Sequence, residues 1–194
     1  MKLVFASNNA HKLAEVRQMM PEGVEVLSLS DIGFHQEIEE TGTTLEQNSE
    51  IKAETVEKWL RVTGYGLSVD GVFADDTGLE IDALGGKPGV YTARWAGEPA
   101  ANRKKALTEL ADKEDRGAQF RTVITLIRAN GEKLSVSGIV RGRIAKEEYG
   151  EGGFGYDPVF IPEGYDKTFG ELTAAIKNTI SHRARALQAL VQIL

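Results

Sequence analysis

The sequence contains no cysteine, which excludes a disulfide framework, a thiolate metal site and a cysteine nucleophile. It also contains no apolar stretch that approaches the length of a transmembrane helix. The apolar run near the N-terminus, residues 3–6, is too short for the hydrophobic region of a signal peptide. We therefore expect a protein of the reducing cytoplasm that has no membrane partner.

An excess of positive charge is absent as well. The formal net charge is −6, so the chain is a poor non-specific binder of nucleic acid, and we expect no nucleic-acid partner. A local group of lysines and arginines could still bind a polyphosphate. Hydrophobic residues at 41% and charged residues at 27% are typical of a globular chain, and 194 residues suffice for one domain with a sizeable core.

Hydrophobic patterns predict strands and helices along the whole chain. Short apolar runs predict strands at residues 2–6, 24–29, 79–84 and 159–161. Helical spacing predicts a first helix that carries Leu13, Val16 and Met20, and further helices over residues 44–62 and 101–112 and from 182 to the C-terminus. β-Rich runs at 119–128 and 133–144 flank Asn130-Gly131, which is typical of a hairpin turn. Residues 85–89 and 166–172 are expected to be loops.

Two adjacent carboxylates, Asp75 and Asp76, follow the apolar run 72–74. We expect this run to be a buried strand that ends at the carboxylates, before a turn at Thr77-Gly78. Open α/β sheets bind ligands at such strand ends. Two neighbouring carboxylates repel each other unless a cation or a proton lies between them, and Mg²⁺ prefers such oxygen ligands. The alternative is that these residues form only a turn.

A second polar segment, residues 7–9, separates the first predicted strand from the first predicted helix. Asn9 and Lys12 lie where backbone N–H groups at a helix start attract phosphate. The same residue types are favoured as helix caps, and the two interpretations are compatible.

The second predicted helix begins with the capping pattern Thr44-x-x-Gln47. Asn48 and Lys52 fall on its apolar face, so they lean toward the interior or toward a cleft. An inward lysine needs an anionic partner to keep its charge, whereas a lysine that extends along the surface does not. The acidic segment before this helix, residues 37–40, is on composition alone a solvated loop.

The glycine-rich segment 150–155 matches a dinucleotide-binding pattern, but a strand and not a helix is predicted after it, so the match is misleading. Phe154 and Tyr156 beside these glycines could stack on a base or could belong to the core. Ser181 is the expected cap of the last helix, with His182 and Arg183 in its first turn. Cations there oppose the helix dipole, which suggests a role other than stability.

Taken in chain order, these segments resemble the inosine triphosphatase family, the pyrophosphatases that act on non-standard purine nucleoside triphosphates. The segments that carry the resemblance are residues 6–12, 39–42, 48–53, 74–79, 84–94, 152–158 and 180–183. Each segment alone is weakly specific, whereas their common order and spacing over nearly the whole chain are highly specific. The resemblance implies an α/β fold with an elongated mixed β-sheet flanked by helices, and two lobes of a single domain with an active-site cleft between them.

The resemblance also implies an activity. Members hydrolyse ITP, dITP and XTP to the monophosphate and pyrophosphate, they use Mg²⁺ as cofactor, and they usually form homodimers. A purine nucleoside triphosphate is then the substrate, and the role is removal of deaminated purines from the nucleotide pool. Two alternatives remain: a purine nucleotide sensor without catalysis, and a septum-inhibitor-type pyrophosphatase that acts on other modified nucleotides.

The family's functional residues map onto matching positions of this sequence. The triphosphate-binding residues implied in this way are Ser7, Asn8, Asn9, Ala10, His11, Lys12 and Lys52. Asp76 is similar to the catalytic carboxylate, and the implied metal ligands are Asp76, Asp75 and either Glu39 or Glu40, of which we favour Glu40. Thr77 stands where the family often has serine, and it keeps the hydroxyl. The residues that resemble the base pocket are Phe154, Gly155, Tyr156, Asp157, Lys177, His182 and Arg183.

The base pocket implied by the resemblance has a clear basis for specificity. Inosine and xanthine carry a 6-oxo group, which accepts hydrogen bonds, where adenine carries an amino donor. Donors from His182 and Arg183 would pair with the oxo group and would be left unpaired by adenine. Guanine shares the oxo group, so its rejection must involve the 2-amino group as well.

Overall fold

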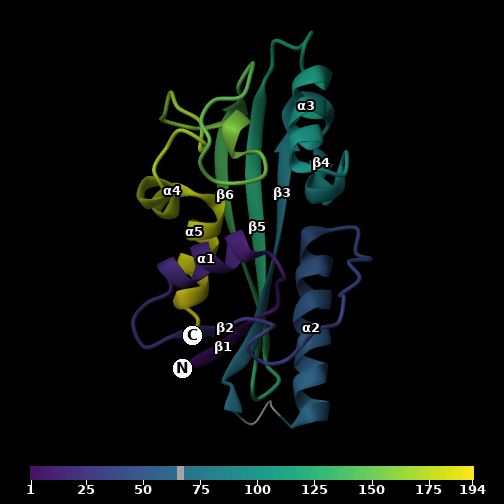
Figure 1. Cartoon of the computed structure of the whole chain (residues 1–194), viewed down its shortest axis with the longest axis vertical. Helices are drawn as coiled ribbons and strands as arrows, with labels where there is room; N and C mark the ends of the chain where they lie inside the picture. The colour runs from purple at the N-terminus through teal and green to yellow at the C-terminus, as the bar shows by residue number, and fades with distance from the viewer. Residues whose placement is uncertain (65–67) are drawn as a thin grey trace. The chain divides into compact units, whose positions relative to one another are not determined.

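The computed structural model describes residues 1–64 and 68–194 of the chain (Figure 1). Its strands form a mixed β-sheet in the order β2-β1-β3-β5-β6-β7, and β4 pairs with β3 outside this path. The strands are β1 (Lys2–Phe5), β2 (Glu25–Leu27), β3 (Gly71–Ile81), β4 (Lys87–Gly89), β5 (Gly117–Arg128), β6 (Lys133–Ile144) and β7 (Phe160–Pro162). The α-helices are α1 (Ala10–Met19), α2 (Leu45–Thr63), α3 (Pro99–Glu109), α4 (Ala174–Ile180) and α5 (His182–Val191). The predicted class, a mixed sheet flanked by helices, is confirmed.

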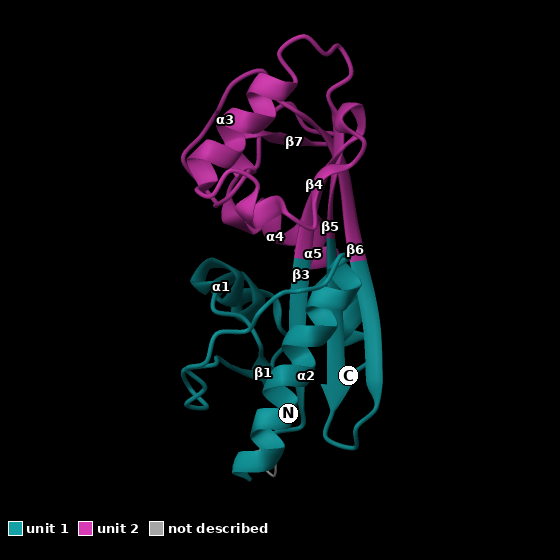
Figure 2. Cartoon of the chain, turned by 90° about the vertical axis from the view of Figure 1, so that its right-hand side faces the viewer, with its two compact units in different colours: residues 1–76, 122–137, 186–194 teal, residues 77–121, 138–185 magenta. Residues whose placement is uncertain are grey.

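The chain forms two compact units (Figure 2). Unit 1 comprises residues 1–76, 122–137 and 186–194, and unit 2 comprises residues 77–121 and 138–185. Strands β3, β5 and β6 each contribute residues to both units. None of the helices in the described part of the chain combines the length and the apolarity needed to cross a membrane.

In unit 1, the alternation of side chains along β1 and β3 divides the core into two layers. Val4 of β1 packs with Val56 of α2 on one side of the sheet. Phe5 of β1 stacks on Phe73 of β3 at 5.0 Å and packs with Val16 of α1 on the other side. Figure 1 shows α2 on one face of these strands, with α1 and α5 on the opposite face.

The first two helices begin at caps that lie within the predicted capping segments. Asn9 caps α1, because its side chain accepts a hydrogen bond from the backbone N–H of Lys12 at 3.1 Å. Thr44 caps α2 in the same way by accepting from the N–H of Gln47 at 3.2 Å. Helix α2 ends at Gly64, whose φ of 77° is readily adopted only by glycine. These short-range signals place Lys12 in the first turn of α1 and Lys52 about two turns into α2.

In unit 2, the core is built between the sheet and the helix α3. Its largest members are aromatic, and Phe160 of β7 contacts both Phe120 of β5 and Phe169 at ring distances of 4.7 and 5.5 Å. Ala106 and Leu110 cover this core from α3 and the turn that ends it. Strand β7 pairs in an antiparallel manner with β6, which places the segment that precedes β7 beside the aromatic core.

The prediction of a turn at Thr77-Gly78 is wrong. The structure has one continuous strand, β3, from Gly71 to Ile81, and both aspartates lie inside it. Asp, Thr and Gly favour turns only when no tertiary partner satisfies the backbone. Here β1 and β4 pair with opposite ends of β3, and a side-chain hydroxyl, that of Thr92, accepts from the N–H of Leu79 at 2.8 Å.

Other local predictions need smaller corrections. Residues 85–89 were expected to form a loop, but residues 87–89 pair with β3 as the short strand β4. Helix α4 was not predicted, because its seven residues are too few for a helical pattern to be recognised. The hairpin at Asn130-Gly131 is confirmed, with a φ of 86° at Gly131 and strands β5 and β6 on either side.

Candidate active site

The polar segment between β1 and α1 is tightly folded. The N–H of Ser7 donates to the carbonyl of Phe5 at 2.9 Å, and the N–H of Asn9 donates to the hydroxyl of Ser7 at 3.2 Å. Residues 8–11 are exposed, whereas Ser7 and Lys12 are half-buried. The segment therefore presents polar groups at the start of α1 on a rigid support, as binding of a phosphate requires.

Lys12 extends from α1 to the sheet, where its Nζ lies 3.0 Å from Oδ1 of Asp75. The exposed fractions of the two side chains are 14% and 2%. Because this ion pair is nearly out of water, removing one partner destabilises the fold more than it would at the surface, since the other charge is then buried without compensation.

Lys52 makes a second set of ion pairs on α2. Its Nζ lies 3.3 Å from Oε2 of Glu40 and 3.5 Å from Oδ1 of Asp76. Burial lowers the pKa of Lys52, but attraction by the carboxylates around it, Asp76 first, outweighs burial and raises the pKa above its usual value. The sequence left open whether Lys52 faces inward or extends along the surface, and the structure buries it.

The ionised form of Asp76 is less favoured than that of a carboxylate in water. Burial raises its pKa, and the opposing attraction of Lys52 and Lys12 does not fully offset that effect. Its Oδ2 is buried and has no hydrogen-bond partner among the residues that the structure describes. A buried carboxylate oxygen of this kind is an available acceptor or metal ligand, which is typical of a functional site.

We call Lys12, Glu40, Lys52, Asp75 and Asp76 the carboxylate–lysine cluster. Because neighbouring side chains of a strand alternate, the two aspartates meet different helices: α1 reaches Asp75 and α2 reaches Asp76. Across the described ranges, 1–64 and 68–194, no three His, Asp or Glu side chains converge as a ready metal site. The oxygen donors nevertheless suit Mg²⁺, which one or two carboxylates commonly hold together with substrate phosphates.

The two glutamates that the sequence could not separate differ in position. Glu40 is half-buried and contacts Lys52, whereas Glu39 is exposed. Thr77, the next residue after the aspartates, is half-buried in β3 and is the first residue of unit 2.

In unit 2, Asp157 organises a second group of predicted residues. Its Oδ2 accepts from the backbone N–H of Phe154 at 2.8 Å and from Nζ of Lys177 at 2.6 Å. A Cβ added to Gly153, whose φ is 71°, would lie 2.0 Å from the same oxygen. Glycine at position 153 is therefore required for the close approach of the backbone to Asp157.

Two cationic side chains lie against the ring of Phe154. Nζ of Lys177 lies 4.7 Å and the guanidinium carbon of Arg183 lies 5.6 Å from the centre of its ring. His182 stacks on Phe120 with ring centres 4.6 Å apart. Such cation–ring contacts stabilise charges that have left water. We call Phe154, Asp157, Lys177, His182 and Arg183 the aromatic–cation cluster; its polar members are at most 4% exposed.

Two further residues support this cluster and were not found from the sequence. Phe120 lies far from His182 in the chain, so no local signal connects them. Nη1 of Arg103, on α3, donates to the carbonyl of Gly155 at 2.9 Å and so holds the glycine-rich segment. Tyr156 is committed to the core instead: its hydroxyl donates to the carbonyl of Thr92 at 2.8 Å, and burial raises its pKa. Its predicted contact with a base stays a prediction.

The last helix confirms the expected cap. The hydroxyl of Ser181 accepts from the N–H of Ala184 at 3.1 Å, and α5 begins at His182. This cap fixes His182 and Arg183 in the first turn, next to the end of α4, which carries Lys177. The cluster is thus assembled by α4, α5 and the glycine-rich segment.

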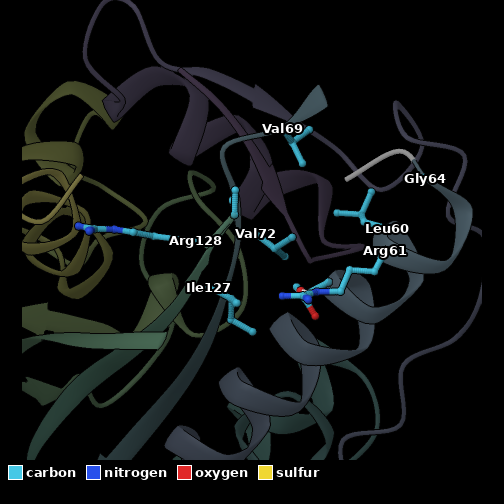
Figure 3. Close-up of a pocket in the computed structure, with 10 residues that line it drawn as sticks. Leu60, Arg61, Gly64, Val69, Val72, Ile127 and Arg128 are labelled. Carbon is cyan, nitrogen blue, oxygen red and sulfur yellow. Dashed lines mark hydrogen bonds and ion pairs between the residues drawn. The ribbon is translucent and has the colours of Figure 1, made fainter. Parts of the chain in front are cut away.

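A cavity of about 390 Å³ lies elsewhere in unit 1 (Figure 3). Its walls include Leu60 of α2, Val72 of β3 and Ile127 of β5, and Arg61 lies beside it. None of the predicted site residues lines it. Glu57, Arg61 and Arg128 also line it, so its walls are mixed in character.

The fold defines an α/β protein, and the carboxylate–lysine cluster gives it a buried group of opposite charges at the start of α1 and on α2. Comparison with known proteins makes this specific: the model of the Ham1 family matches residues 3–193. The chain belongs to the Ham1 family.

Individual relatives agree with this assignment. A dITP/XTP pyrophosphatase of Flavobacterium johnsoniae is 49% identical over 197 residues, covering 100% of this chain and 98% of the relative. The solved structure of the Staphylococcus aureus Ham1 protein is 39% identical, with a TM-score of 0.85 and coverage of 100% and 97%. That of a HAM1 protein from Coxiella burnetii is 37% identical, with a TM-score of 0.86 and coverage of 100% and 98%.

Proposed function

We propose that this chain is a Mg²⁺-dependent pyrophosphatase that hydrolyses ITP, dITP and XTP to the nucleoside monophosphate and pyrophosphate. The observation that supports it most is the buried carboxylate–lysine cluster, in which Lys52 lies against both Glu40 and Asp76. The similarity to relatives named dITP/XTP pyrophosphatase, over the full length of the chain, supports the choice of substrate.

The proposed roles in unit 1 follow from charge and position. The start of α1 and the ammonium groups of Lys12 and Lys52 bind the triphosphate and hold the leaving pyrophosphate. Asp76, with Glu40 and Asp75 as its partners, would hold the metal, and the exposed Glu39 is the weaker alternative to Glu40. Mg²⁺, when bound, neutralises phosphate charge.

Asp76 also orients the attacking water and accepts its proton. In the metal-free chain burial raises the pKa of Asp76, and its buried Oδ2 is an acceptor without a partner among the described residues, so a positioned carboxylate is available as general base. The attack is in line at the α-phosphorus, and positioning together with charge stabilisation accounts for most of the acceleration. On attack, the bond between the α-phosphorus and the oxygen that bridges it to the β-phosphorus breaks. The ammonium groups of the two lysines stabilise the negative charge of the pyrophosphate that leaves.

The aromatic–cation cluster of unit 2 binds the base in this proposal. Phe154 offers a ring face, while His182 and Arg183 donate to the 6-oxo group of hypoxanthine or xanthine. Adenine presents an amino group there and leaves these donors unsatisfied, which disfavours ATP. The two units then act as one pyrophosphatase domain.

The test is release of pyrophosphate from ITP, XTP, GTP, ATP and dTTP, with Mg²⁺ and with EDTA. We expect release from ITP and XTP, little from ATP or dTTP, and none in EDTA. Tight binding of ITP without release would favour a nucleotide sensor. A preference for dTTP would favour a septum-inhibitor-type enzyme.

Assembly and location complete the proposal. We propose a homodimer in the cytoplasm, where the nucleotide pool is. Light scattering at micromolar concentration should give twice the chain mass of 21.2 kDa. A mass of a single chain would contradict the dimer without affecting the proposed reaction.

A further inference from the structure

Asn48 on α2 has no role in the reaction as described so far, yet it is completely buried. Its Oδ1 accepts a hydrogen bond from the backbone N–H of Gly42 at 2.8 Å. Because a backbone N–H can only donate, this contact fixes the orientation of the amide and leaves Nδ2 on the other side. Nδ2 is buried and has no hydrogen-bond partner among the described residues.

This arrangement is not explained by stability. An unpaired buried donor costs free energy, whereas an apolar side chain of similar size would fill the same space without that cost. A local feature that opposes stability is expected where function requires it. The amide of Asn48 is held by the backbone of Gly42, so the segment around Gly42 is where such a function is to be sought.

Gly42 lies two residues after the acidic segment 37–40, which carries Glu39 and Glu40, and its surroundings are crowded. A Cβ at this position would lie 2.6 Å from Oδ1 of Asn48 and 2.7 Å from Cβ of Gln47. The backbone of Gly42 therefore rests directly on the first turn of α2. Two residues earlier, Glu40 reaches Lys52, which is one helical turn after Asn48 on the same side of α2.

We propose that Asn48 is a positioning residue: it clamps the acidic segment through Gly42, so that Glu40 is held at Lys52 and Asp76 for metal binding. This inference rests on the metal site of the proposed function.

The experiment perturbs the clamp from both ends in the full-length chain. Asn48→Leu removes the acceptor and the unpaired donor, and Gly42→Ala displaces the segment while Asn48 stays intact. Val56→Ala is the control, because Val56 lies two turns further along the same face of α2 and is completely buried, far from the acidic segment in the helix. It lowers stability without touching the clamp.

Two readouts are independent of turnover. The first is Mn²⁺ binding, measured by electron paramagnetic resonance with Mn²⁺ alone as the probe. We expect Asn48→Leu and Gly42→Ala each to raise the dissociation constant about 3- to 10-fold, which corresponds to the usual worth of one hydrogen bond. The double variant should be no worse than the more severe single variant, since both remove the same contact.

The second readout is hydrogen exchange of the amides of residues 39–43. It should be faster in both clamp variants and unchanged in Val56→Ala. Mn²⁺ affinity and exchange like those of the wild type in both clamp variants would overturn the inference, as would an equal loss of affinity in Val56→Ala. If Asn48→Leu does not fold, Gly42→Ala decides alone. Failure of the wild type to bind Mn²⁺ would instead contradict the proposed metal site.

Discussion

At Asp76, burial and charge act in opposite directions. Burial raises the pKa of this carboxyl group, and the nearby ammonium groups lower it, with burial prevailing. The folded chain therefore holds this proton more tightly than the unfolded chain does. As the pH rises through the folded pKa, the ionised group lowers the stability of the fold, even after its attraction to Lys52 is counted.

Substitution of Asp76 by asparagine removes that penalty. In EDTA we expect Asp76→Asn to have a melting temperature a few degrees above that of the wild type at pH 8. The difference should shrink as the pH falls through the folded pKa, and it should disappear only below the ordinary aspartate pKa of 3.8, where the wild-type carboxyl group is protonated in both states. Pyrophosphate release should fall by about 10²- to 10⁴-fold, the usual contribution of general base catalysis. A scan of melting temperature against pH checks the first statement. A lower melting temperature at pH 8, or near-normal turnover, would show that Asp76 is structural.

Gly153 is required for steric reasons that another glycine of unit 2 does not share. Its φ is 71°, and a Cβ would meet Oδ2 of Asp157 at 2.0 Å. Gly164 has a similar φ of 83° but no atom within 4 Å of such a Cβ. Backbone strain alone costs about 1–3 kcal/mol, whereas Gly153→Ala must also break the hydrogen bonds of Asp157.

We therefore predict that Gly153→Ala lowers the free energy of unfolding by about 2 kcal/mol more than Gly164→Ala does. Urea denaturation of the two variants measures the difference. Equal losses would mean that the glycine-rich segment moves aside and that Asp157 does not depend on it.

The starts of helices α1 and α2 could be predicted from local sequence signals, whereas the course of strand β3 could not. The caps of Asn9 and Thr44 act within three residues, so the starts of α1 and α2 could be read from the sequence. The break at Thr77-Gly78 could not be judged in this way. Whether an Asp-Thr-Gly segment turns depends on strands β1, β4 and β5, which are distant in the sequence.

Strand β3 offers a test of this explanation at the level of an element. The hydroxyl of Thr92 accepts from the N–H of Leu79 at 2.8 Å and donates to the carbonyl of Gly89. Thr92→Val keeps the shape but leaves the buried N–H of Leu79 without an acceptor. We expect a loss of about 1–3 kcal/mol in unfolding free energy.

Thr92→Ser is the matched variant, because it retains the hydroxyl and should lose much less stability than Thr92→Val. Thermal or urea unfolding of both variants supplies the comparison. If the two variants were equally destabilised, the loss would come from packing and the hydrogen bond to β3 would carry no weight.

The whole molecule explains why the candidate site was only partly predictable. The common order of segments 6–12, 39–42 and 74–79 with the other segments could be matched to a family, but the ion pairs between them could not be read from the chain. The partners of Lys52 and Lys12 lie 24 and 63 residues away from them. Phe120 and Arg103 were missed for the same reason, since neither stands in a recognisable motif. Tyr156 stands in a recognisable motif, but its side chain is buried in the core of unit 2.

In the proposed reaction, water attacks the α-phosphorus and pyrophosphate leaves. Hydrolysis of ITP by the protein with Mg²⁺, in water enriched with ¹⁸O and followed by mass spectrometry of both products, tests which phosphorus is attacked. We expect the label in the inosine monophosphate and none in the pyrophosphate. Label in the pyrophosphate, or release of inosine diphosphate and labelled orthophosphate, would contradict the proposed reaction.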